Sequence, residues 1–157
     1  MSIPDEGRLQ QMAAQLQELD QVIDVLRSQV QRMRLEQAEL RDAVEAIESL
    51  DDGDEVQVPL GGGAFVRAAI EDMDAVIVGL GAGYAAERGE AEAVELLEGQ
   101  AERLQSEIDE ATDAIADLEA QGEELGAQAQ QEYTALAARQ QQAAGGGLTG
   151  ANLGGNQ

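Results

Sequence analysis

Two long heptad patterns flank a short central segment, and they constrain the fold more than any other feature of the chain. In each pattern, steps of three and four residues alternate between apolar positions, which is the spacing of helices that supercoil about a partner. The first seam comprises Leu9, Met12, Leu16, Leu19, Ile23, Leu26, Val30, Met33, Gln37, Leu40, Val44 and Ile47. The second seam comprises Val94, Leu97, Ala101, Leu104, Ile108, Ala111, Ile115, Leu118, Gly122, Leu125, Ala129, Glu132 and Leu136. We interpret the polar Gln37 as a residue that sets the register of the pairing.

The two seams predict helices that fold back on one another. The first helix is expected over residues 4–50 and the second over residues 89–142, followed by a flexible Gly-rich tail over residues 143–157. Because the seams have similar lengths, an antiparallel coiled coil within the chain uses both of them fully and places Leu9 near Leu136. Helices that extended apart would instead expose two apolar stripes.

The segment between the helices, residues 55–87, predicts two β-hairpins in tandem. Its apolar residues alternate with polar ones at the start, and glycine runs separate short strand-like stretches. The stretch over residues 75–80 is apolar on both faces, so we expect this strand to be buried. Isolated hairpins are marginal in water, so strands of other copies or of a related subunit are expected to cover them. The residues that need such cover are Val56, Val58, Val66, Ile70, Val76, Val78 and Leu80.

The charge of the chain excludes several classes of partner. The formal net charge is −23, and the nine basic residues are all arginine. Such a chain repels nucleic acid and anionic membranes, so neither is expected to bind it. Abundant acids and alanine without lysine are typical of proteins that work in high salt, where the Debye length falls to about 3 Å.

The chain has no histidine and no cysteine, so general acid–base catalysis, thiol chemistry and transition-metal sites lose their usual residues. We expect no catalytic residue, no metal and no cofactor. The glycines of GLGAGY, residues 79–84, are interpreted as a tight turn, and the acids around residues 51–55 as a helix stop. The N-terminus lacks the features of a signal peptide, and the chain lacks an apolar run of membrane-spanning length, so the cytoplasm is the expected location.

The helix ends near both termini carry apolar residues that have two interpretations. Ordinary seam packing is one; the other is a mobile apolar contact surface, since coiled-coil ends fray and methionine adapts to irregular partners. The residues concerned are Ile3, Leu9, Met12, Tyr133 and Leu136, with Leu148 as a further candidate.

The order of helix, two hairpins and helix resembles the prefoldin family, specifically its archaeal alpha subunits. The likeness covers about residues 5–142 and is sharpest in VPLGGGAFVRAAIEDMDAVIVGLGAGYAAER, residues 58–88. Beta-class subunits of that family have a single hairpin, so the doubled hairpin indicates the alpha class.

This resemblance implies a mainly α fold, in which a long antiparallel coiled-coil hairpin carries two β-hairpins that assemble into a β-barrel between subunits. It implies that the subunits assemble as a hexamer of two alpha and four beta chains. It also implies that the hexamer is an ATP-independent chaperone, which holds unfolded polypeptides at the coiled-coil tips and passes them to a group II chaperonin. The client surface is then formed by the residues near the termini named above. The residues implied in assembly are Val56, Val58, Phe65, Val66, Ile70, Val76, Val78, Leu80 and Tyr84.

Three other functions stay open from the sequence. A coiled-coil scaffold or adaptor binds one folded partner and ignores unfolded polypeptides. A homo-oligomeric chaperone needs no beta subunit. Enzymatic catalysis is the least favoured of the three, since histidine and cysteine are missing.

Overall fold

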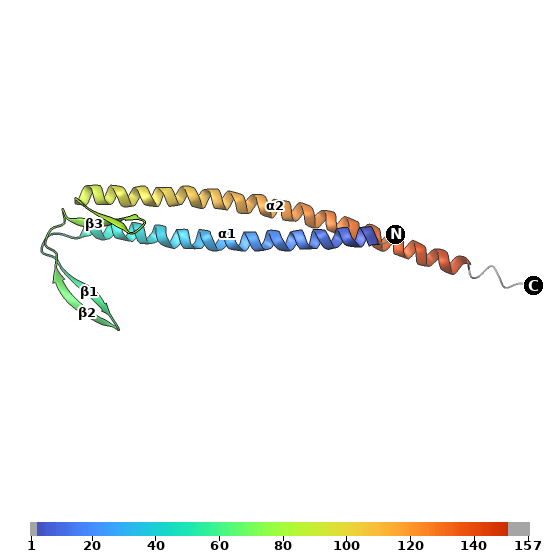
Figure 1. Ribbon diagram of the computed structural model, residues 1–157, viewed down its shortest axis with the longest axis horizontal. Coiled ribbons are helices and arrows are strands. Elements are labelled where there is room, and N and C mark those ends of the chain that lie inside the picture. The colour runs from blue at the N-terminus through green and yellow to red at the C-terminus, as the bar shows by residue number, and fades with distance from the viewer. Residues whose placement is uncertain (1–2, 151–157) are drawn as a thin grey trace, which may run out of the picture. The chain divides into compact units, whose positions relative to one another are not determined.

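The computed structural model describes residues 3–150, and the side chains of residues 5–145. Two long helices enclose four short strands in the chain order α1, β1, β2, β3, β4, α2 (Figure 1). Their bounds are α1 Ile3–Ser49, β1 Glu55–Gly61, β2 Ala64–Ala69, β3 Val76–Gly81, β4 Tyr84–Arg88 and α2 Glu90–Gly150. The prediction of a mainly α chain with two central hairpins is confirmed.

The chain divides into two compact units, which we describe separately. The terminal unit contains residues 1–28 and 111–157, and the central unit contains residues 29–110. Each unit holds a stretch of α1 against a stretch of α2, and the central unit also holds the strands.

The helices begin close to the expected residues, but α2 ends later than expected. Asp5 and Glu6 occupy the first turn of α1, where acids favour the positive end of the helix dipole. In α2 the helix continues to Gly150, whereas the sequence predicted an end at about Gln142. Alanine-rich sequence propagates a helix well, and glycine weakens it by only about 1 kcal/mol per residue, so the glycines here do not act as a stop.

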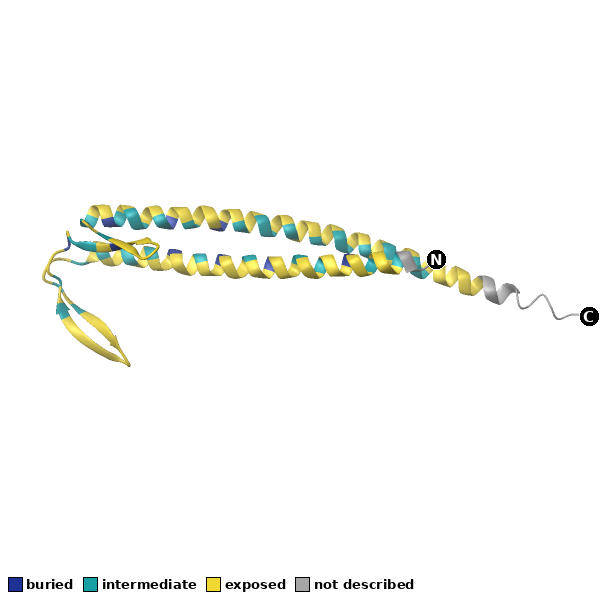
Figure 2. Ribbon diagram, viewed as in Figure 1, coloured by how far each residue is buried: buried dark blue, intermediate teal, exposed yellow. Residues whose placement is uncertain are grey.

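In the terminal unit, the buried and half-buried parts of α1 and α2 lie on the sides of the two helices that face one another (Figure 2). Met12 and Ile23 are buried and their seam neighbours are half-buried. The antiparallel alignment is marked by three ion pairs between exposed or half-buried side chains: Asp5 with Arg139, Arg8 with Glu132, and Arg27 with Glu119. The antiparallel pairing predicted from the seams is confirmed.

In the central unit, the seam buries Val30, Ala101 and Ile108 together with the polar Gln37. The Nε2 atom of Gln37 donates to the backbone oxygen of Ala101 at 3.1 Å and to Oε1 of Gln105 at 2.9 Å. A buried amide is tolerated only where such partners exist, so these bonds favour one alignment of α1 and α2 over a slipped one.

The four strands form two separate antiparallel hairpins, β1–β2 and β3–β4. The second hairpin repeats the strand pairing of the first with every residue number raised by twenty: Val56 pairs with Ala68, and Val76 pairs with Arg88. Both ladders are interrupted by a bulge just before the turn, at Leu60 and at Leu80. No closed barrel forms among the strands that the structure describes in this single chain.

The turns of the two hairpins also match. The residues at the centre of the first turn, Gly62 and Gly63, have φ of 60° and 80°. In the second turn Ala82 and Gly83 have φ of 53° and 80°. Positive φ at both positions is the type I′ geometry whose twist suits a two-residue hairpin. Glycine adopts positive φ freely, whereas the Cβ of Ala82 raises the conformational free energy of the second turn.

Strand β3 is covered on one of its two faces in the single chain. Val78 is 3% exposed, but its neighbour Ile77 is 75% exposed. One face of the hairpin packs against the helices of the central unit, and among the described residues no second layer covers the other. Burial of that other face by a further subunit stays a prediction.

Over the described part of the chain, no helix is both long and apolar enough to span a membrane.

Candidate functional site

Hairpin β1–β2 presents an apolar face without cover. Successive residues of a strand point to opposite faces, so the register places Val56, Val58, Val66 and Ala68 together. Val58 is 41% exposed, Val66 is also exposed, and Val56 and Ala68 are half-buried. Phe65 is exposed on the opposite face. An apolar face of this kind is typical of a surface that joins another subunit.

Hairpin β3–β4 turns the equivalent face toward the helices of the central unit. Val78 is buried, and Val76 and Ala86 beside it are half-buried. The amide of Gln100 on α2 donates to the backbone oxygen of Gly79 at 3.1 Å, which fixes β3 beside the helix (Figure 1).

The outer face of hairpin β3–β4 is apolar and open. Ile77 is exposed there, and near the turn Leu80 and Tyr84 are exposed as well. Leu80 lines a groove of about 520 Å³ together with Leu40 and Leu104 of the two helices. Thus Leu80 and Tyr84 are accessible, as an assembly role requires, whereas Val78 packs against the chain's own helices.

The segments that join helices and hairpins are fixed by carboxylates that accept backbone hydrogen bonds. Oδ1 of Asp52 accepts from the backbone N–H of Met73 at 2.6 Å, and Oδ2 of Asp54 accepts from the N–H of Asp51 at 2.9 Å. The side chain of Met73 is buried under this connection, and Ile70 is half-buried at the base of the first hairpin. These acids therefore hold the junction, which agrees with their interpretation as a helix stop.

Near the termini, the expected client residues fall into two classes. Met12 is 7% exposed, and Leu9 and Leu136 are half-buried in the seam of the terminal unit. Tyr133 is 62% exposed and lies off the seam. The side chain of Ile3 lies outside the described residues, as does that of Leu148. The structure therefore offers Tyr133 directly, whereas Leu9, Met12 and Leu136 become accessible only when the helix ends separate.

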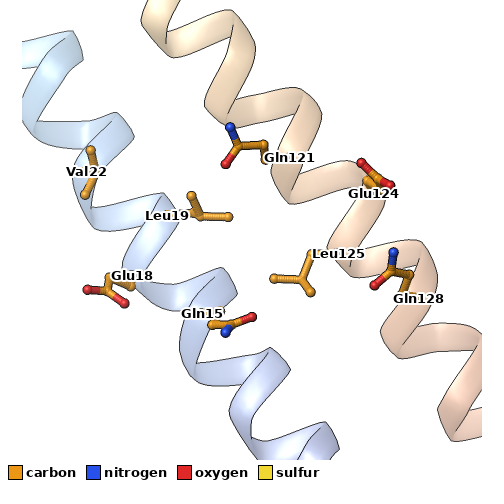
Figure 3. A pocket seen from close by; sticks show the side chains of 8 residues that line it. All are labelled: Gln15, Glu18, Leu19, Val22, Gln121, Glu124, Leu125 and Gln128. Carbon is orange, nitrogen blue, oxygen red and sulfur yellow. The ribbon is translucent and has the colours of Figure 1, made fainter.

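A groove between α1 and α2 in the terminal unit was not found from the sequence. It measures about 550 Å³ and is lined by Gln15, Glu18, Leu19, Val22, Gln121, Glu124, Leu125 and Gln128. Leu19 and Leu125 point towards one another across the gap, with amide and carboxylate side chains around them (Figure 3). The heptad pattern gave no signal for it, because most of the residues that line the groove are polar.

The described side chains offer binding surfaces and no assembled reactive group. Among them, no three His, Cys, Asp or Glu residues gather in a way that could hold a metal ion. The ion pairs lie at the surface, between exposed arginines and exposed or half-buried acids, and contribute about 0–1 kcal/mol each. The arrangement offers two kinds of apolar surface: the open faces of the hairpins, and the residues near the helix ends.

Comparison with known proteins identifies relatives with this architecture. The profile of the family described as "Prefoldin subunit" matches residues 19–135. A prefoldin subunit alpha from Haloarcula marismortui is 44% identical over 116 residues, which cover 74% of this chain and 75% of that one. Another from Halorubrum lacusprofundi is 51% identical over 77 residues, 49% of this chain and 51% of that one. In the structure of filamentous PFD from Methanocaldococcus jannaschii, a chain with 31% identity matches with a TM-score of 0.64, covering 71% of this chain and 95% of that chain.

The matched residues include both hairpins and most of both seams, the features on which the resemblance rested. Several relatives come from halophilic archaea, in agreement with the acidic, lysine-free composition. The chain therefore belongs to the prefoldin family of chaperone subunits.

Proposed function

We propose that this chain is an alpha-type subunit of an ATP-independent holdase, which captures unfolded polypeptides near its helix termini and delivers them to a group II chaperonin in the cytoplasm. The observation that carries the proposal is the pair of apolar hairpins that the single chain leaves partly uncovered. A protein that functions as a monomer has no need of such exposed apolar hairpin faces.

Assembly through the hairpins follows from their energetics. Two-stranded hairpins are marginal in water, and exposed apolar strand residues such as Val58, Phe65 and Ile77 gain about 25 cal/mol per Å² of apolar surface when a partner covers them. The partners proposed are beta-type prefoldin subunits, in a hexamer of two alpha and four beta chains whose hairpins form a β-barrel. The relatives named as prefoldin subunits support this assembly.

Capture of unfolded polypeptide is proposed for the terminal unit. Tyr133 offers an exposed aromatic ring, and separation of the helix ends exposes Leu9, Met12 and Leu136. Each such surface is small, so a single subunit binds weakly. Several subunits on one platform raise the effective concentration of binding surfaces and therefore the avidity, without any nucleotide.

Removal of the helix ends tests this proposal. A chain lacking residues 1–12 and 133–157 is expected to assemble with a beta-type subunit as the full chain does, because its hairpins are intact. It is expected to lose the suppression of aggregation of a denatured protein, measured by light scattering without nucleotide. Full protection by the shortened chain would contradict capture near the termini.

A point substitution sharpens the same test. Tyr133→Ser removes an exposed aromatic group from the terminal unit, whereas Leu35→Ser removes an exposed apolar group from the central unit. We expect the first to weaken protection and the second to leave it unchanged. A chain that binds one folded partner and protects no denatured protein would instead be a coiled-coil adaptor.

A further inference from the structure

The groove of about 550 Å³ in the terminal unit has an apolar pair at its centre. Leu19 of α1 and Leu125 of α2 point toward one another across the gap between the helices (Figure 3). Both occupy seam positions, but they are only half-buried, whereas the seam residues Met12 and Ile23 of the same unit are buried. An aliphatic side chain that packs against both leucines therefore removes further apolar surface from water, which is favourable.

Three glutamine side chains surround this apolar pair: Gln15 from α1, and Gln121 and Gln128 from α2. All three are exposed, and over the residues that the structure describes none of them makes a side-chain hydrogen bond. An amide side chain both donates and accepts, which matches the N–H and C=O groups of a peptide backbone. The peptide groups of a helix are already bonded within that helix, so these amides favour an extended occupant over a helical one.

Glu18 of α1 and Glu124 of α2 complete the lining, which contains no arginine. Neither carboxylate forms an ion pair with any described residue. The grooves lined by Leu16, by Val44 and by Leu80 differ, since each of them includes an arginine. A carboxylate that has no cation of its own chain accepts charge-assisted hydrogen bonds from an ammonium or guanidinium group of a bound molecule.

We propose that this groove binds an extended segment of unfolded polypeptide in which a lysine or arginine lies two residues before and two residues after an aliphatic residue. Every second residue of an extended chain points to the same side, so all three side chains face the groove together. The aliphatic group packs against Leu19 and Leu125, and the cations contact Glu18 and Glu124. This inference rests on the proposed holdase function and adds the class of segment that the terminal unit selects.

The spacing of the pattern suits a segment that crosses the groove from one helix to the other. The axes of packed helices lie about 8–10 Å apart. The two cations are four residue steps apart, which is about 13 Å in an extended chain. One cation therefore lies over each helix, on the side of the carboxylate that this helix supplies, with the aliphatic residue midway between them.

Charge favours this occupant over an acidic segment or a second copy of the chain. With a formal net charge of −23, the chain repels both, and each brings further carboxylates toward Glu18 and Glu124. In molar salt the Debye length is about 3 Å, so distant charges are screened whereas contacts at hydrogen-bond distance remain. We therefore expect the selection of cationic segments to persist in high salt.

Short peptides test this selection. The probe is a fluorescently labelled peptide Ser-Lys-Ser-Leu-Ser-Lys-Ser, and its binding to the full chain in molar salt is followed by fluorescence anisotropy. An exposed ion pair changes binding by up to about fivefold, so replacement of both lysines by glutamate is expected to weaken binding by about tenfold. Replacement of the leucine by serine is also expected to weaken binding, because it removes the group that packs against the two leucines of the groove.

Reversal of the two charges locates the site. In the variant with Glu18→Lys and Glu124→Lys, we expect the preference to invert, so that the glutamate peptide binds more tightly than the lysine peptide. The control variant, Asp20→Lys with Glu123→Lys, makes the same change of net charge at exposed positions of the groove lined by Leu16. It is expected to keep the preference for the lysine peptide. Circular dichroism checks that each variant retains its helices.

The proposal is overturned if the natural chain binds the lysine and glutamate peptides equally, or if the two charge-reversed variants show the same preference. Equal binding of the leucine and serine peptides would also overturn it, because the attraction would then be that of any cation to an acidic chain. The aggregation assays described above decide the holdase function separately. Protection of a denatured protein without discrimination between peptides contradicts only the selectivity, and discrimination without protection contradicts only the holdase function.

Discussion

Among single residues, Gln37 combines burial with polarity most sharply. Its amide donates hydrogen bonds to Ala101 and Gln105 in the central unit. Burial of the amide therefore costs little free energy in this alignment of the helices, and much in an alignment without these partners. The sequence predicted this role because Gln37 interrupts an otherwise apolar seam. It could not predict the partners, since these depend on how far α2 is shifted along α1.

Replacement of Gln37 measures its contribution. Gln37→Ala removes both hydrogen bonds and leaves a cavity, so we expect the free energy of unfolding to fall by about 1–3 kcal/mol. Gln37→Leu keeps the volume and is expected to be close to neutral. Exposed Gln31 on the same helix is the control, and Gln31→Ala should change stability by less than about 0.5 kcal/mol. Urea unfolding followed by circular dichroism gives these values; equal losses for Gln37→Ala and Gln31→Ala would contradict the role.

At the scale of elements, both seams were predictable from sequence, because heptad spacing alone decides which helix face is buried. Every seam position is buried or half-buried in the structure. The sequence could not show which face of β3 the chain's own helices cover, since an apolar run does not distinguish the two faces. The groove beside Leu19 was missed because most of the residues that line it are polar, so no apolar pattern marks it.

The glycines of α2 give a test of how far loosening of the helices contributes to function. A Cβ at Gly126 meets no heavy atom within 4 Å, so Gly126→Ala fits without strain and should stabilise α2 by about 1 kcal/mol. If capture of clients requires the helix ends to separate, this variant should protect a denatured protein less well.

Gly99→Ala is the matched control for that experiment. It also has room for a Cβ and should give a similar gain in stability, but it lies in the central unit. Aggregation assays on the two variants distinguish an effect of stabilising the terminal unit from an effect of stabilising α2 in general. Equal protection by both, at equal stability, would argue against loosening of the terminal unit.

For the molecule as a whole, net charge is the dominant physical property. A chain of 157 residues with a formal charge of −23 repels itself, and assembly of several copies multiplies that repulsion. Salt relieves it, because the Debye length falls from about 30 Å at 10 mM to about 3 Å at 1 M. The origin of these relatives in halophilic archaea is consistent with a protein that functions in high salt.

We therefore expect helicity to decrease as salt is lowered from molar to millimolar concentration, measured by circular dichroism at 222 nm. A variant with Glu95, Glu102 and Glu110 changed to Gln carries three fewer negative charges at exposed positions of α2. It should keep more helix at low salt and match the natural chain at high salt. Identical salt curves for the two proteins would show that repulsion is not the cause.

The repetition of one hairpin after the other supplies the chain with an internal reference. Val58 and Val78 are the same residue at the same step of the same ladder, yet one meets solvent and the other meets helices. Any substitution made at both sites changes the strand identically, so its local preferences cancel when the two effects are subtracted. What survives the subtraction is the influence of the neighbourhood alone, a quantity that most proteins yield only by comparison with a different molecule.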